Sequence, residues 1–119
     1  MGGLEKYTAM NCPVTATMDI ISGKWKPIIL WRLYNGVQRF GELKRQLPGI
    51  TQKMLTQQLR ELEQDNIIER KVFAEVPPRV EYSFSAYGKT LQPVLHAMCD
   101  WGEEHLKKIS DGGFRISDL

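Results

Sequence analysis

Residues 40–65, FGELKRQLPGITQKMLTQQLRELEQD, decide the fold of this 119-residue chain. A short predicted helix ends at Pro48-Gly49, because proline removes a backbone donor and glycine tolerates a left-handed backbone. Thr51 is then a suitable N-cap for a longer helix, which we expect to run to about Asp65. Two helices joined by so tight a turn form a helix-turn-helix.

The second helix of this pair has two different faces. Its apolar residues recur with helical spacing and predict one stripe packed on a core: Met54, Leu55, Leu59 and Leu62. Short and medium polar side chains collect on the opposite side: Thr51, Gln52, Lys53, Thr56, Gln57 and Arg60. Glutamine pairs with adenine, arginine and lysine pair with guanine, and threonine contacts a phosphate or a thymine methyl group. We therefore expect the polar face to read bases in the major groove.

After Asn66 the spacing of apolar residues changes from helical to alternating. Residues 68–73 and 80–84 alternate as strands do, and the loop between them contains two adjacent prolines that fix the backbone. The pattern predicts a β-hairpin with a rigid tip within residues 67–84. Because a hairpin directly after a helix-turn-helix forms a wing, Arg79 is a candidate for contact with a narrow minor groove.

Helices are predicted on both sides of this unit. Proline at a first helical position and glycine at a stop predict two helices within residues 12–35. Ser85 caps a predicted long helix over residues 86–109, in which Pro93 marks a kink or a weak first turn. The expected fold class is mainly α with a small β-hairpin, a winged helix-turn-helix with terminal dimerisation helices. We expect residues 1–119 to form a single domain.

The last predicted helix carries more apolar side chains than a small domain needs for its own core. Leu95, Met98 and Trp101 share its apolar stripe, and tryptophan and methionine are favoured at interface cores. A helix of about 35 Å also overhangs such a domain. We expect a homodimer interface here; the alternative is that the stripe only closes the core of its own chain.

Charge is distributed unevenly along the chain. The sequence holds 16 Lys and Arg against 14 Asp and Glu, yet residues 24–60 carry a net charge of +7. A basic block on a nearly neutral chain favours a polyanionic partner such as double-stranded DNA, although a lopsided solvated surface would look the same. Arg39, Lys44 and Arg45 lie before the turn and are expected to contact phosphates.

Several short motifs resemble the HxlR family of transcriptional regulators. They include Gly23-Lys24-Trp25, residues 55–60 (LTQQLR) and residues 76–82 (VPPRVEY), and the resemblance extends from residue 12 to about residue 105. It implies a MarR-like winged helix-turn-helix homodimer that binds inverted-repeat operators. It further implies sensing of electrophiles or oxidants, since many members of the family use a cysteine at the position of Cys12 for this purpose.

The residues around Cys12 allow two interpretations. Cys12 precedes Pro13 at a helix start, where backbone dipoles stabilise a thiolate, so its modification is a hypothesis for control of DNA binding. The alternative is an unreactive, half-buried cysteine. Cys99 is expected to be a small core residue. Two cysteines, with no secretory leader and no run of about 20 apolar residues, predict a soluble cytoplasmic protein without a membrane partner.

Other functions have weaker support in the sequence. His96 and Cys99 stand three residues apart, but no further Cys–His pair accompanies them, so no metal is expected. No phosphate loop or hydrolase motif is present, and we expect neither an enzyme nor a cofactor. Two alternatives stay open. One is a protein-interaction module with a winged fold, and the other is a small-molecule-responsive regulator with a pocket lined by Trp25, Trp31 and Trp101.

Overall fold

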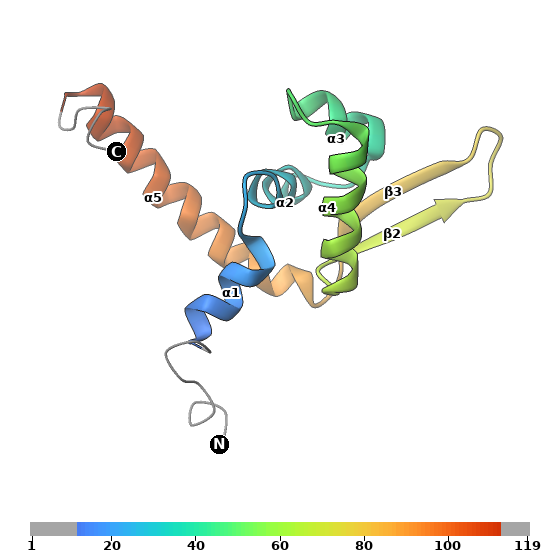
Figure 1. Ribbon diagram of the computed structural model, residues 1–119, viewed down its shortest axis with the longest axis horizontal. Coiled ribbons are helices and arrows are strands. Elements are labelled where there is room, and N and C mark those ends of the chain that lie inside the picture. The colour runs from blue at the N-terminus through green and yellow to red at the C-terminus, as the bar shows by residue number, and fades with distance from the viewer. Residues whose placement is uncertain (1–11, 113–119) are drawn as a thin grey trace, which may run out of the picture.

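The computed structural model describes residues 12–112, which form a mainly helical fold with a small antiparallel sheet (Figure 1). The elements in chain order are α1 (Pro13–Ile21), α2 (Lys26–Tyr34), β1 (Gln38–Arg39), α3 (Phe40–Gln46), α4 (Gln52–Gln64), β2 (Ile68–Phe73), β3 (Arg79–Phe84), the 3-10 helix η2 (Gly88–Leu91) and α5 (Gln92–Ser110). This order agrees with the predicted one, apart from an additional short strand and a different start of the last helix.

The helix-turn-helix consists of α3 and α4. Thr51 caps α4 as predicted, because its hydroxyl oxygen accepts a hydrogen bond from the Met54 N–H at 3.1 Å. The turn before it passes through Gly49 with a φ of 92°, a backbone conformation that favours glycine. Leu47 and Ile50 on either side of this glycine are buried, so the turn is attached to the core. The relative placement of the two helices therefore follows from both the cap and the packing.

The sheet has the strand order β1-β3-β2, and all its pairs are antiparallel. The predicted hairpin is confirmed: its register runs from Ile68 opposite Phe84 to Phe73 opposite Arg79. The hairpin projects away from the helices, and its tip lies far from α5 (Figure 1). The sequence does not indicate β1, because two residues are too few to show alternation. Its pairing with β3 joins the start of α3 to the wing.

The last helix starts later than predicted. We expect a helix from residue 86, but α5 begins at Gln92, after η2. The reason is Pro93, which lacks an N–H and fits only in a first turn. The N-cap of η2 is Tyr87 rather than the predicted Ser85, although the Ser85 hydroxyl oxygen accepts a hydrogen bond from the Gly88 N–H at 2.8 Å. A Cβ added to Gly88 would lie 1.8 Å from the Ile67 carbonyl oxygen, so the chain approaches itself closely here.

The inner face of α4 is narrower than predicted. Leu55, Leu59 and Leu62 are buried in the core, whereas Met54 is exposed. The prediction for Met54 was wrong because the three leucines follow i, i+4 and i+7 spacing, and the residue before the first one is rotated away from that line. The core-facing stripe of α4 is therefore a row of three leucines.

Candidate nucleic-acid interface

The polar face of α4 is accessible along its length. Thr51, Gln52, Lys53, Gln57 and Arg60 are exposed, and Thr56 is half-buried. A shallow groove follows this face, and a second hollow of about 330 Å³ lies where Gln52 and Arg60 approach the sheet residues Arg70 and Tyr82. The structure thus places five of the six predicted base-contacting residues along one groove, and the sixth, Thr51, is the N-cap at the start of the same helix.

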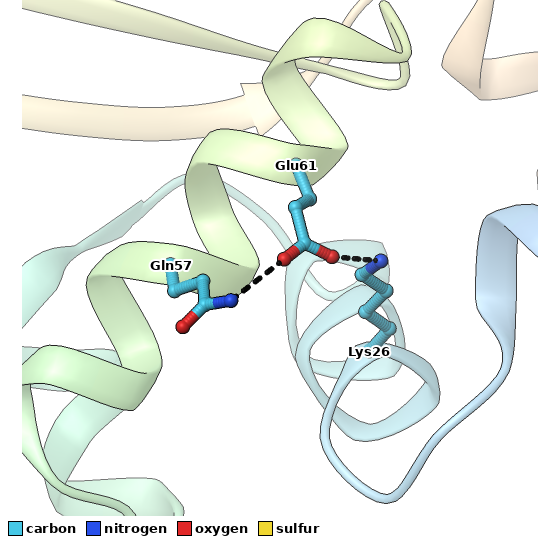
Figure 2. A network of polar contacts seen from close by, with 3 residues as sticks. All are labelled: Lys26, Gln57 and Glu61. Carbon is cyan, nitrogen blue, oxygen red and sulfur yellow. Dashed lines mark hydrogen bonds and ion pairs between the residues drawn. The ribbon is translucent and has the colours of Figure 1, made fainter.

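One residue of this face is held by an ionic network that joins α4 to α2 (Figure 2). The Lys26 Nζ lies 2.6 Å from the Glu61 Oε1, and the Gln57 Nε2 donates a hydrogen bond to the Glu61 Oε2 at 3.3 Å. The hydrogen bond from Lys26, then its charge, and then the hydrogen bond from Gln57 hold the pKa of the Glu61 carboxyl below its ordinary value, against a smaller effect of burial. Lys26 is buried, so its charge is used inside the protein rather than at the surface.

The predicted phosphate contacts are exposed basic residues at the two ends of α3. Lys44 and Arg45 lie in the last turn of α3, and Arg39 is the residue before that helix. Within residues 12–112, none of these three side chains forms an ion pair with an acidic residue. Their charges are therefore available to an anionic partner.

Arg79 occupies a different environment from the other predicted contacts. Its guanidinium forms ion pairs with Glu75 and Glu81, both at 3.3 Å, and lies 4.0 Å from the centre of the Phe73 ring. The side chain begins β3 and is only partly exposed, so two carboxylates neutralise it on the surface of the hairpin. The exposed cations of the wing are Arg70 and Lys71 on β2. The alternation in the sequence did not single out these two residues, because adjacent residues of a strand point to opposite faces.

The two cysteines lie in different places. Cys12 is the half-buried N-cap of α1, and its carbonyl oxygen accepts a hydrogen bond from the Ala16 N–H at 3.0 Å. The prediction that Cys99 is a core residue was wrong, because its thiol is half-buried and donates to the Glu103 carboxylate at 3.6 Å. Partial burial, together with the nearby charges of Glu103 and Asp100, raises the pKa of the Cys99 thiol.

α5 projects from the body on the side opposite the wing (Figure 1). Leu95 is its one fully buried side chain and belongs to the core of its own chain, whereas Met98 and Trp101 are 42% and 70% exposed. A cavity of about 290 Å³ between α2 and α5 is lined in part by Trp31, Leu95 and Met98. Trp25 is buried in the core and Trp101 is exposed, so the three tryptophans do not line one pocket.

His96 lies 3.4 Å from Asp100, and the described residues contain no cluster of three His, Cys, Asp or Glu side chains that would suit a metal ion. None of the described helices combines the length and the apolar character that a membrane span requires.

Comparisons with known proteins identify relatives over most of the chain. A family model described as HxlR-like helix-turn-helix matches residues 20–110. The chain is 54% identical over 99 residues to YdeP, an HTH-type transcriptional regulator of Bacillus subtilis. This alignment covers 83% of this chain and 77% of YdeP. It is 50% identical over 112 residues to YtcD, an HTH-type transcriptional regulator of the same bacterium. This alignment covers 94% of this chain and 86% of YtcD.

Solved structures give the same result. The redox regulator HypR in its reduced form has a TM-score of 0.79 and 47% sequence identity, over 84% of this chain and 99% of HypR. Its oxidised form has a TM-score of 0.75 and 52% identity, over 78% of this chain and 96% of HypR. These similarities confirm the winged helix-turn-helix class and the resemblance that the sequence motifs indicated.

Proposed function

The chain belongs to the HxlR-like helix-turn-helix family of transcriptional regulators, and from this premise we propose that it binds inverted-repeat operators as a homodimer under thiol control. The observation that carries the proposal is the division of α4 into two faces. Its leucines are buried, while Gln52, Lys53 and Gln57 remain exposed beside the wing. A recognition helix needs this division, because the core must fix the helix while its outer face meets the base edges.

Positive charge beside α4 supports a duplex as the partner. Lys44, Arg45 and Arg39 contact phosphates in this proposal, which fixes the orientation of α4 without adding base preference. Thr51, Gln52, Lys53, Thr56, Gln57 and Arg60 face the major groove. In place of a free Arg79, Arg70 and Lys71 provide the accessible charge of the wing.

The exposed apolar face of α5 supports a dimer. Met98 and Trp101 extend from a helix that stands away from its own core, and exposed aromatic and methionine side chains are typical of interface centres. Leu95 contributes by holding α5 on the body of each protomer. Two protomers related by a twofold axis present two copies of α4, which accounts for an operator with two inverted half-sites.

Control through Cys12 has two supports. Cys12 is the N-cap of α1 and part of its surface is exposed, so an electrophile or oxidant can reach its thiol. HypR, which shares this fold, is named a redox regulator in both its reduced and its oxidised form. An electrophile or oxidant that modifies Cys12 would then alter the arrangement of the two copies of α4.

Selection of bound duplexes from a random DNA library tests the proposal. The expected result is an inverted repeat with half-sites about one or two helical turns apart, bound with strong salt dependence. Treatment with an oxidant should weaken binding, and Cys12→Ser should abolish that response, with Cys99→Ser as the matched control. Absence of any enriched sequence would refute operator reading and favour a protein-interaction module. A response that survives Cys12→Ser would refute control through this residue.

A further inference from the structure

The contacts of Gln57, Glu61 and Lys26 have a fixed direction (Figure 2). An ammonium group only donates hydrogen bonds, and an ionised carboxylate only accepts them. Lys26 therefore donates to one oxygen of Glu61, and the other oxygen can be satisfied at Gln57 only by the amide nitrogen. The orientation of the Gln57 amide therefore follows from the chemistry of its neighbours.

This orientation determines what Gln57 offers to a ligand. A free glutamine can turn its terminal amide by half a rotation and present either its oxygen or its nitrogen. Because the Nε2 faces Glu61, the Oε1 of Gln57 is directed away from it, as Figure 2 shows. In the major groove, adenine and cytosine present amino donors, whereas guanine and thymine present carbonyl acceptors. An outward oxygen matches the first pair of bases.

We propose that Glu61, held by Lys26, is a positioning residue that presents the Gln57 oxygen as an acceptor and so selects adenine or cytosine at one position of each half-site. The inference rests on the proposed function, because it requires α4 to lie in the major groove. It adds to that function the chemical class of base that Gln57 contacts. It also assigns the choice of base to Glu61, a residue that need not touch DNA.

The network is suited to hold this orientation when DNA binds. Gln57 and Glu61 are one turn apart on α4, so their contact moves with the helix as a unit. Lys26 comes from α2 and is buried, so water competes little for its charge. The lowered pKa of Glu61 keeps this carboxyl ionised, and therefore accepting only, throughout the neutral pH range.

The variant Glu61→Gln distinguishes orientation from simple packing. Lys26 must still donate, so the oxygen of the new amide faces Lys26 and its nitrogen faces Gln57. The amide of Gln57 then turns its oxygen inward and its nitrogen outward. Selection from a random library should show the wild type preferring adenine or cytosine, and the variant preferring guanine or thymine, by about tenfold at the same position. Gln57→Ala identifies this position, because it removes the preference there.

Two controls separate this effect from charge and from folding. Glu63→Gln removes the same charge from the same helix and should leave the preferred base unchanged, even if affinity for all duplexes rises. If Glu61→Gln does not fold, Lys26→Met combined with Glu61→Gln replaces it, because no buried cation is then left without a partner. In that double variant the new amide is free to turn either way, so the preference should relax to within about twofold rather than invert.

The possible outcomes separate the two proposals. No enriched sequence with the wild type would refute the proposed function, and the inference would fall with it. A clear operator in which Gln57 governs a guanine or thymine would overturn the inference alone. The inference would also be overturned if Glu61→Gln, or the double variant used in its place, left the base preference unchanged. It would be overturned too if Gln57→Ala altered the base preference at no position. The inference is supported if the base preference at the Gln57 position inverts in Glu61→Gln, or relaxes in the double variant.

Discussion

α4 and α5 are both amphipathic, but they use their apolar faces in opposite ways. In α4 the three leucines are buried within the chain, and the polar face is the accessible one. In α5 only Leu95 is fully buried, while Met98, Trp101 and Leu106 remain exposed. The same helical spacing in the sequence therefore produces a helix fixed by its own core in one case, and a helix with an open apolar face in the other.

The difference shows what each helix contributes. A side chain buried in its own protomer contributes to the free energy of unfolding, whereas an exposed apolar side chain contributes once a partner covers it. In the proposed function, α4 must be held rigidly, because small displacements would move its polar side chains away from the base edges. α5 has no such requirement along its outer half, and its exposed face is available to a second copy. Substitutions on the two helices should therefore affect different measurements.

Truncation of the buried face of α4 should have the largest effect. Leu59→Ala removes a side chain that is 1% exposed, and we expect a loss of about 2–5 kcal/mol in the free energy of unfolding. Met54→Ala on the same helix is the matched control and should cost less than about 1 kcal/mol, because Met54 is already exposed. Urea denaturation measures both variants. Equal losses would contradict the assignment of the two sides of α4.

Truncation of the open face of α5 should weaken dimerisation without unfolding the protomer. Trp101 is 70% exposed and its ring stacks on His105, so it presents a flat apolar surface to a partner. Trp101→Ala should cost about 2 kcal/mol of dimer affinity, a factor of about 30 in the dissociation constant. Light scattering over a range of concentrations measures this, with Lys107→Ala as a control on the same helix. An unchanged dissociation constant would place the interface elsewhere.

The basic residues beside α4 allow a smaller and more selective test. Lys44 is exposed and unpaired within the described residues, so Lys44→Ala should weaken binding to all duplexes and reduce the salt slope by about one. Arg79 is neutralised by Glu75 and Glu81, so Arg79→Ala should change the slope by less. Titration of each variant with duplex DNA at several salt concentrations compares the two salt slopes. A larger effect of Arg79→Ala would mean that DNA displaces its two carboxylates.

The sequence predicted the features that depend on neighbouring residues and missed those that depend on distant contacts. The leucine row of α4 and the cap at Thr51 require only local spacing and local hydrogen bonds. The ion pair between Lys26 and Glu61 joins residues 35 positions apart, and no periodicity in the chain indicates it. Arg79 is an intermediate case. Glu81 lies two residues further along the same strand, so it shares a face with Arg79, and this spacing was a usable signal.

The ion pair between Lys26 and Glu61 predicts that the stability of the fold depends on pH. This effect should be smaller than the effects of the substitutions at Leu59, Trp101 and Lys44. Lys26 lowers the pKa of the Glu61 carboxyl below its ordinary value of 4.5. A carboxyl group whose pKa is lower in the folded state stabilises the fold above its unfolded pKa, and this stabilisation is lost as the pH falls through the folded pKa. The Tm difference between wild type and Lys26→Met should thus be constant near neutral pH and shrink below about pH 4.5. Lys53→Met, an exposed lysine on α4, is the control. A difference that persists unchanged in acid would assign the effect to packing of the Lys26 side chain, and the ion pair would then contribute little to holding α4 on α2.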